Sequence, residues 1–111
     1  MRRCGLKWRV TGKACSIILL AGVLSNASRA DNAAEIYHDK CSACHGKHGK
    51  SDTIFGKNLK IRPLASPEVL AQSDTELATI ISKGKGRMPS FERKLSSEQI
   101  KQVIDYIRSL K

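Results

Sequence analysis

The sequence predicts an all-α domain, and two observations carry that prediction. Apolar residues recur at helical spacing in segments that begin at capping residues, most clearly over residues 96–110. No segment alternates apolar and polar residues in the manner of a half-buried strand. We therefore expect one small domain of helices joined by loops, over residues 31–111, behind a removable leader.

Residues 1–30 have the pattern of a signal peptide. Five basic residues and no acid lie within residues 1–13, and an unbroken apolar or small run follows over residues 14–24. This run is well short of the roughly 20 residues that a membrane-spanning helix needs. Ser28 and Ala30 supply the small residues that a signal peptidase requires, so we expect cleavage after Ala30 rather than after Ala27.

Loss of the leader changes the charge and the cysteine content. The whole chain carries a net charge of +10, but the leader holds six basic residues and no acid, so residues 31–111 carry +4. This mild excess, without an aromatic-rich basic stretch, gives no indication of nucleic-acid binding. Only Cys41 and Cys44 remain, and a disulfide across so short a loop would stabilise little. A domain this small therefore needs another source of stability.

The first helix is expected over residues 31–40, directly behind the leader. Asp31 or Asn32 is a suitable cap for its start. A polar loop is expected to follow from residue 46 to about residue 61.

Two further helices are expected after this loop. Ser66 as cap, with Pro67 at the first helical position, predicts a short helix. Ser73 and Glu76 stand at capping-box spacing before a second helix, and Gly84 is its expected end.

The last helix carries the clearest pattern. Ser96 and Gln99 stand at capping-box spacing at its start. Its apolar residues line one face at helical spacing: Ile100, Val103, Ile104, Ile107 and Leu110.

Residues 41–45, CSACH, match the C-x-x-C-H pattern of covalent haem attachment. Residues three apart share one face of a helical turn, so the thiols of Cys41 and Cys44 can reach the two vinyl groups on one porphyrin edge. His45 then brings its imidazole under the iron. A thioredoxin-like redox pair would need a βαβ context, and a zinc site with His48 would crowd four ligands into eight residues. The pattern predicts one haem c.

Met88 is expected to be the second iron ligand. It is the only methionine after the leader, and Pro89 and the glycines before it place it in an irregular loop between two helices. A packing role in the core is the usual alternative for a methionine. His38 and His48 are the rival ligands, but both are too close to His45 in sequence to cross the ring easily.

With these motifs, the stretches IYHDKCSACHGKHGK, GKGRMPSF and LSSEQIKQVIDYIRSL resemble a small class I bacterial cytochrome c. The resemblance covers essentially all of residues 31–111. It implies the class I cytochrome c fold, in which crossed N- and C-terminal helices wrap around one covalently attached haem. It also implies thioether links at Cys41 and Cys44, with His45 as proximal and Met88 as distal ligand.

Two further positions of the family bear on this chain. Tyr37 and Tyr106 match the aromatic residues where the two helices usually meet. In many relatives a proline soon after the motif accepts a hydrogen bond from the axial histidine. The nearest candidate here is Pro63, eighteen residues after His45.

Histidine and methionine at both axial positions would leave no open site for a substrate, and methionine raises the reduction potential. The sequence thus predicts a soluble periplasmic electron carrier, not an enzyme, that cycles its haem between Fe(III) and Fe(II). We expect a monomer without a membrane anchor after cleavage. Two alternatives stay open: a fixed haem subunit of a larger oxidoreductase complex, or a haem-based sensor in which Met88 dissociates.

Redox-partner proteins are the expected partners. Five basic residues flank Met88 and would form a rim that steers an acidic docking surface, unless they are ordinary solvated side chains. They are Lys83, Lys85, Arg87, Arg93 and Lys94.

Overall fold

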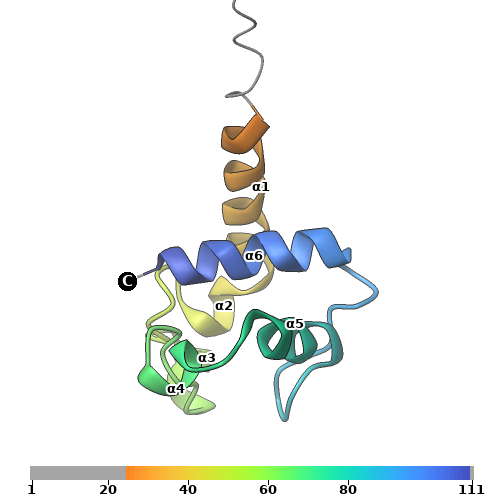
Figure 1. The fold of residues 1–111 in the computed structure, drawn as a ribbon. Helices are drawn as coiled ribbons and strands as arrows, with labels where there is room; N and C mark the ends of the chain where they lie inside the picture. Colours follow the sequence, from red (N-terminus) through yellow and green to blue (C-terminus); the bar gives the residue numbers. More distant parts are fainter. Residues whose placement is uncertain (1–24, 111) are drawn as a thin grey trace, which may run out of the picture.

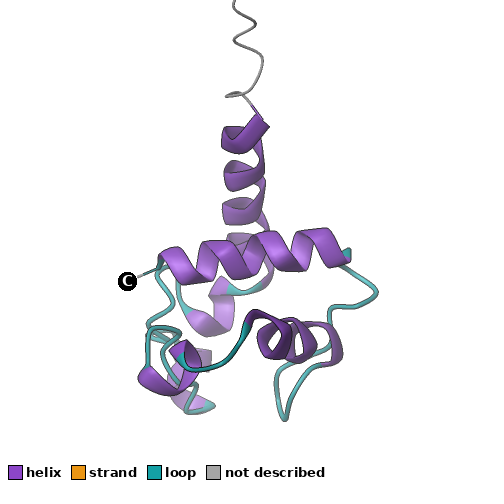
Figure 2. Cartoon of the chain, viewed as in Figure 1, coloured by secondary structure: helices purple, strands orange, loops and turns teal. Residues whose placement is uncertain are grey.

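The computed structural model describes residues 25–110, and their regular structure is helical (Figures 1 and 2). No strand occurs within this range, so the all-α prediction is confirmed. The helices, in chain order, are α1 (Ser25–Lys40), α2 (Ser42–His45), α3 (Ile54–Asn58), α4 (Pro67–Leu70), α5 (Asp74–Lys83) and α6 (Ser97–Ser109).

The first and last long helices cross. Figure 1 shows α6 lying across the C-terminal end of α1, and the two helices are in contact. The rings of Tyr37 and Tyr106 meet at this crossing, with centroids 5.2 Å apart and planes tilted by 51°. Tyr37 is fully buried, and its hydroxyl donates a hydrogen bond to the carbonyl of Gly46 at 2.7 Å. The expected pairing of these two tyrosines is confirmed.

The start of α1 differs from the prediction. The helix begins at Ser25, so Asp31 and Asn32 lie inside it and are not its cap. Residues 25–40 contain neither glycine nor proline and are rich in alanine, the best helix former, so nothing in the sequence stops the helix at residue 31. The predicted cleavage point after Ala30 falls on an exposed part of α1, whereas residues 1–24 of the predicted leader lie outside the described residues.

The predicted polar loop contains a short helix that the sequence analysis missed. Thr53 caps α3, because its hydroxyl oxygen accepts the backbone N–H of Gly56 at 2.9 Å. The same hydroxyl donates to the carbonyl of Cys44 at 3.2 Å and thus ties α3 to α2. A side chain at Gly56 would collide with the carbonyl oxygens of Ser51 and Cys44. The loop is therefore closely packed against the segment that carries the cysteines.

The remaining helices begin and end largely as predicted. Capping boxes are present at Ser73–Glu76 of α5 and Ser96–Gln99 of α6. Gly84 ends α5 with φ 79°, a conformation that favours glycine. Ser66 precedes Pro67 at the start of α4, but its hydroxyl makes no capping bond.

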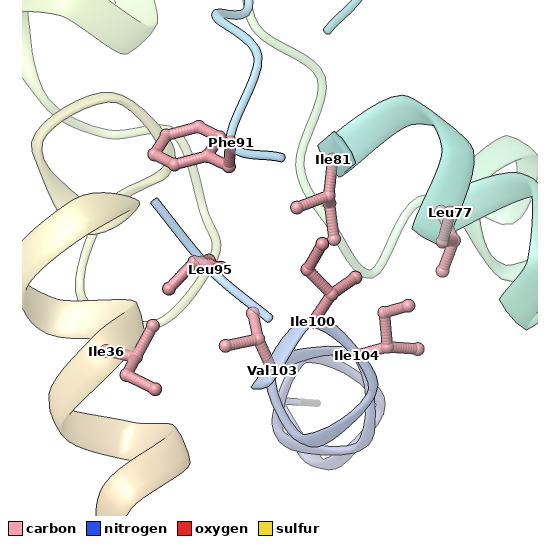
Figure 3. Close-up of a cluster of buried hydrophobic side chains, with 8 residues drawn as sticks. All are labelled: Ile36, Leu77, Ile81, Phe91, Leu95, Ile100, Val103 and Ile104. Atoms are coloured by element: carbon pink, nitrogen blue, oxygen red, sulfur yellow. The ribbon is translucent and has the colours of Figure 1, made fainter. Parts of the chain in front are cut away.

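A cluster of apolar side chains from α1, α5, α6 and the segment before α6 forms the core (Figure 3). Cys41, Val69 and Met88 are partly buried and pack against this cluster. The core thus supports the residues predicted to hold a haem. Its buried members are Ile36, Leu77, Ile81, Phe91, Leu95, Ile100, Val103 and Ile104.

None of the helices in residues 25–110 is long and apolar enough to cross a membrane.

Candidate functional site

The two cysteines and the following histidine lie on a single helical turn. Cys41 is the N-cap of α2, and its carbonyl accepts the N–H groups of Cys44 at 3.2 Å and of His45 at 2.9 Å. This tight turn brings both thiols and the imidazole to the same cavity. Both thiols are free and half-buried.

Burial sets the protonation of these groups. It raises the pKa of the Cys41 thiol to about 11, with a smaller increase from Cys44 and an opposing effect of Lys40. Burial also lowers the pKa of His45. At neutral pH Cys41 is therefore a neutral thiol, whereas a redox nucleophile is a thiolate. The imidazole of His45 is neutral, which is the form that binds a metal.

A tight hairpin turn presents Met88. The N–H of Met88 donates to the carbonyl of Lys85 at 3.0 Å, and the N–H of Lys85 donates back to Met88 at 3.1 Å. Gly86 lies at the tip of this turn with φ 58°. Gly84 precedes it, and a Cβ atom there would lie 2.7 Å from the carbonyl oxygen of Met88. The backbone around the methionine is therefore closely specified.

The chain after Met88 is fastened to the end of α5. The N–H of Phe91 donates to Ile81, and the N–H of Glu92 donates to Ser82, both at 3.1 Å. The hydroxyl of Ser90 also donates to the carbonyl of Ser82, at 2.5 Å. These bonds fix both ends of the loop that carries the methionine.

The slot between these residues consists of two adjoining apolar cavities. Its outer part, of about 330 Å³, is lined by Cys41, Cys44, His45 and Met88 together with Leu59, Ile61, Pro89, Phe91 and three basic residues. Its inner part, of about 150 Å³, reaches α4, α5 and α6. Both parts share four lining residues: Cys41, His45, Met88 and Phe91. The structure thus brings all four predicted site residues to the same cavity.

The rival ligands lie elsewhere. His38 and His48 are exposed, and neither lines this cavity. His38 contacts Tyr106 instead, with Nε2 3.4 Å from the tyrosine hydroxyl. Within residues 25–110 no group of three or more histidine, cysteine and acidic side chains could share a metal ion, so the zinc alternative has no geometric support.

Pro63 does not have the role that its position suggested. It is exposed, and its carbonyl accepts the N–H of Ser66 at 3.0 Å. Nδ1 of His45 is buried without a hydrogen-bond partner among the described residues. In this structure the ring of His45 is therefore held by burial rather than by a proline carbonyl.

Several residues of the cavity were not singled out from the sequence. Leu59 and Ile61 line its outer part, and Arg62 and Gln72 lie among the residues of the inner part. The first two are apolar residues in a stretch rich in lysine, which is a weak signal of a buried face. No local pattern marks Gln72.

Two thiols on one turn, a half-buried imidazole and a methionine thus line one apolar slot. Residues 28–107 match a family model described as cytochrome c oxidase, cbb3-type, subunit III. The chain belongs to the class I cytochrome c family. The cytochrome relatives include the cytochrome c6 of Gloeothece citriformis, which is 34% identical over 82 residues, or 73% of this chain and 71% of that protein. The resemblance inferred from the sequence is confirmed.

A relative of another kind matches only in part. The subunit CcoP of the cbb3-type cytochrome c oxidase of Azospirillum brasilense is 27% identical over 88 residues. The match covers 78% of this chain but only 30% of that subunit. Among solved structures, the KustC0563 c-type cytochrome has a TM-score of 0.65 and 31% identity, over 71% of this chain and 96% of that one. The class I cytochrome c fold is thereby confirmed.

The cytochrome c family implies haem c, and the residues present fit it. The slot is mainly apolar, as a porphyrin requires, and the two thiols lie one helical turn apart. The imidazole of His45 and the thioether of Met88 line the same slot. Electron transfer is the function that this family membership supports.

Proposed function

We propose that the chain carries one electron at a time on a single haem c, linked through thioethers to Cys41 and Cys44. His45 and Met88 are the proposed axial ligands. When bound, the haem supplies the Fe(III)/Fe(II) couple. The observation that carries the proposal is the single cavity shared by all four side chains.

The surrounding residues suit a carrier better than an enzyme or a sensor. With both axial positions occupied, no position is open to a substrate or to oxygen, and methionine favours a high reduction potential. A sensor would need Met88 to leave its position easily. The backbone pair with Lys85 and the bonds from Ser90, Phe91 and Glu92 to α5 oppose such movement.

We propose that an acidic surface of the redox partner docks at the mouth of the cavity. Lys85 and Arg87 line this mouth, as does Lys40, which was not among the flanking residues considered from the sequence. Two of those residues are engaged within the chain. Lys83 pairs with Glu92 at 2.6 Å, and the ammonium of Lys94 lies 5.7 Å from the ring centroid of Phe91. Lys40 is also engaged, because it pairs with Asp39 at 2.9 Å. Docking would therefore depend mainly on Lys85 and Arg87.

The same proposal includes export. Residues 1–30 would be removed as a signal peptide, and residues 31–111 would act as a monomer in the bacterial periplasm without an anchor. The basic start, the apolar run of residues 14–24 and the small residues before position 31 support this. Mass spectrometry of the exported protein would locate the cleavage site. A mature chain that begins before residue 25 would contradict it.

A fixed haem subunit of a larger complex is the second candidate. Three exposed apolar side chains favour it: Ile54 and Phe55 on α3, 78% and 59% exposed, and Leu70 on α4, 55% exposed. The carrier is better supported, because the chain spans 71% of the cytochrome c6 of Gloeothece citriformis and only 30% of CcoP.

A spectrum and a redox titration of the purified holoprotein test the proposal. The oxidised protein should show the weak near-infrared sulfur-to-iron charge-transfer band and titrate as a single one-electron centre. Met88→Ala should remove the band and lower the potential. An unchanged spectrum in Met88→Ala would show that Met88 is a packing residue and not an iron ligand. Carbon monoxide binding to the ferrous wild type would favour the sensor.

A further inference from the structure

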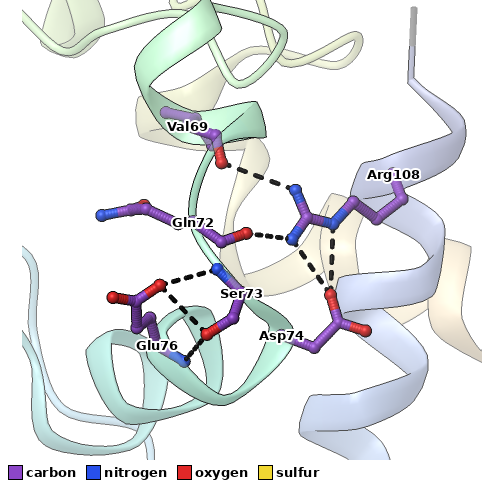
Figure 4. Close-up of polar contacts among 6 residues, drawn as sticks. All are labelled: Val69, Gln72, Ser73, Asp74, Glu76 and Arg108. Carbon is purple, nitrogen blue, oxygen red and sulfur yellow. Dashed lines mark hydrogen bonds and ion pairs between the residues drawn. The ribbon is translucent and has the colours of Figure 1, made fainter.

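Arg108, in the last turn of α6, bonds to Val69 in α4, to Gln72 in the connection that follows it and to Asp74 at the start of α5 (Figure 4). Its Nε and Nη2 donate to one carboxylate oxygen of Asp74, at 3.2 and 3.0 Å. Nη2 also donates to the carbonyl of Gln72 at 2.5 Å, and Nη1 to the carbonyl of Val69 at 3.5 Å. One guanidinium thus joins α6 to a segment more than thirty residues earlier in the chain.

This segment has little else to hold it. The helix α4 is four residues long and has no buried residue, although Val69 packs partly buried against the core. The Ser66 hydroxyl provides no cap, and Leu70 is exposed. The Ser73–Glu76 capping box lies within α5 and makes no bond to another helix. Arg108 is therefore the principal polar attachment of residues 69–74 to α6.

The attached residues are also a wall of the inner cavity. Val69 and Gln72 line it from the α4 side, and Ile107, next to Arg108, lines it from α6. If residues 69–72 moved away from α6, the gap between these two sides would widen and expose more of the inner cavity to solvent. The carbonyls of Val69 and Gln72 accept the hydrogen bonds of Arg108, and both residues belong to the wall. The bonds of Arg108 therefore help to set the position of the wall.

We propose that Arg108 is a positioning residue that holds residues 69–74 against α6 and so keeps this wall of the proposed haem cavity in place. It thereby controls the access of water and small ligands to the haem. The effect on ligand access rests on the proposed haem, whereas the position of the wall is a property of the polypeptide alone. A planar guanidinium can bond to several acceptors at once, which neither an amide nor a lysine ammonium reproduces.

The experiment compares holoproteins of wild type, Arg108→Gln, Arg108→Lys and the control Lys101→Gln. Lys101 is an exposed cation on the same helix, and it takes part in none of the ion pairs found in residues 25–110. Two rates are measured. One is imidazole binding to the ferric haem. The other is hydrogen exchange of the backbone N–H groups of residues 70–72, which bond within this segment.

Both rates should rise at least tenfold in Arg108→Gln, which corresponds to about 1.4 kcal/mol in the opening equilibrium. Arg108→Lys should give a smaller rise, and Lys101→Gln should match wild type. A lower melting temperature with both rates unchanged, in either arginine variant, would overturn the proposal and leave Arg108 a general stabiliser. If the purified chain is folded but carries no haem, the proposed function fails, whereas the exchange of residues 70–72 still decides whether Arg108 holds the wall in place.

Discussion

Gly84→Ala should disturb the loop that carries Met88 (the methionine loop) more than any other glycine-to-alanine substitution in that loop. Gly84 has φ 79° and ψ 166°, a region that essentially only glycine occupies. A Cβ atom at this position would lie 2.7 Å from the carbonyl oxygen of Met88 and 3.0 Å from the N–H nitrogen of Ser90. Both neighbours are backbone atoms that cannot rotate away, so the loop itself must shift.

The backbone conformation sets the size of the effect. Holding a residue other than glycine in this region costs about 1–3 kcal/mol, and the contact with Met88 adds to that cost unless the loop relaxes. We expect the free energy of unfolding of the oxidised holoprotein, measured in denaturant, to fall by at least about 1–3 kcal/mol. Because relaxation displaces Met88, the sulfur-to-iron band should also weaken.

Gly86→Ala is the matched control. Gly86 also has a positive φ, of 58°, but a Cβ atom there would meet nothing within 4 Å. Gly86→Ala should lower the free energy of unfolding by roughly 1–2 kcal/mol, the cost of the left-handed conformation alone. It should leave the sulfur-to-iron band unchanged. The reasoning is refuted if Gly84→Ala leaves stability and band unchanged, or if Gly86→Ala weakens the band equally.

Three further predictions concern attachment, docking and pH. Haem staining should survive a denaturing gel in wild type and vanish in Cys41→Ala/Cys44→Ala. The haem-free chain of this variant should be mostly disordered by circular dichroism, and a helical, cooperatively melting chain would contradict this. Lys85→Glu/Arg87→Glu should slow oxidation by anionic ferricyanide about tenfold at low salt; an equal slowing at high salt would argue against steering. Burial chiefly raises the pKa of Tyr37 to about 12. Because the unfolded chain deprotonates first, near pH 10, wild type should lose stability between pH 10 and 12. Tyr37→Phe should lack this loss, as denaturant titrations across that range would show.

The features that the sequence predicted well depend on neighbouring residues. The C-x-x-C-H motif and the capping boxes of α5 and α6 involve residues within four positions of each other, so their geometry follows from one helical turn. Met88 could be assigned to a loop for the same reason, since Pro89 and the glycines before it act locally. The pairing of Tyr37 with Tyr106 came instead from the family resemblance.

The features that the sequence did not predict depend on distant contacts or on weak local preferences. Arg108 meets Gln72 across thirty-six positions, and no short pattern records that contact. Lys83 pairs with Glu92 only because the methionine loop turns back on α5. The helix α3 is too short to show a period, and the start of α1 was misplaced because a good cap at Asp31 does not compel a helix to begin there.

The two sides of the cavity are held in different ways, and this difference bears on function. Backbone hydrogen bonds and Gly84 fix the Met88 loop, so its position does not depend on any one side chain. The wall at Val69 and Gln72 depends largely on Arg108. An electron carrier needs ligands that stay in place in both oxidation states, and the rigid loop around the proposed ligand Met88 meets that need. A wall held largely by one arginine makes residues 69–74 the first place where the folded holoprotein would open.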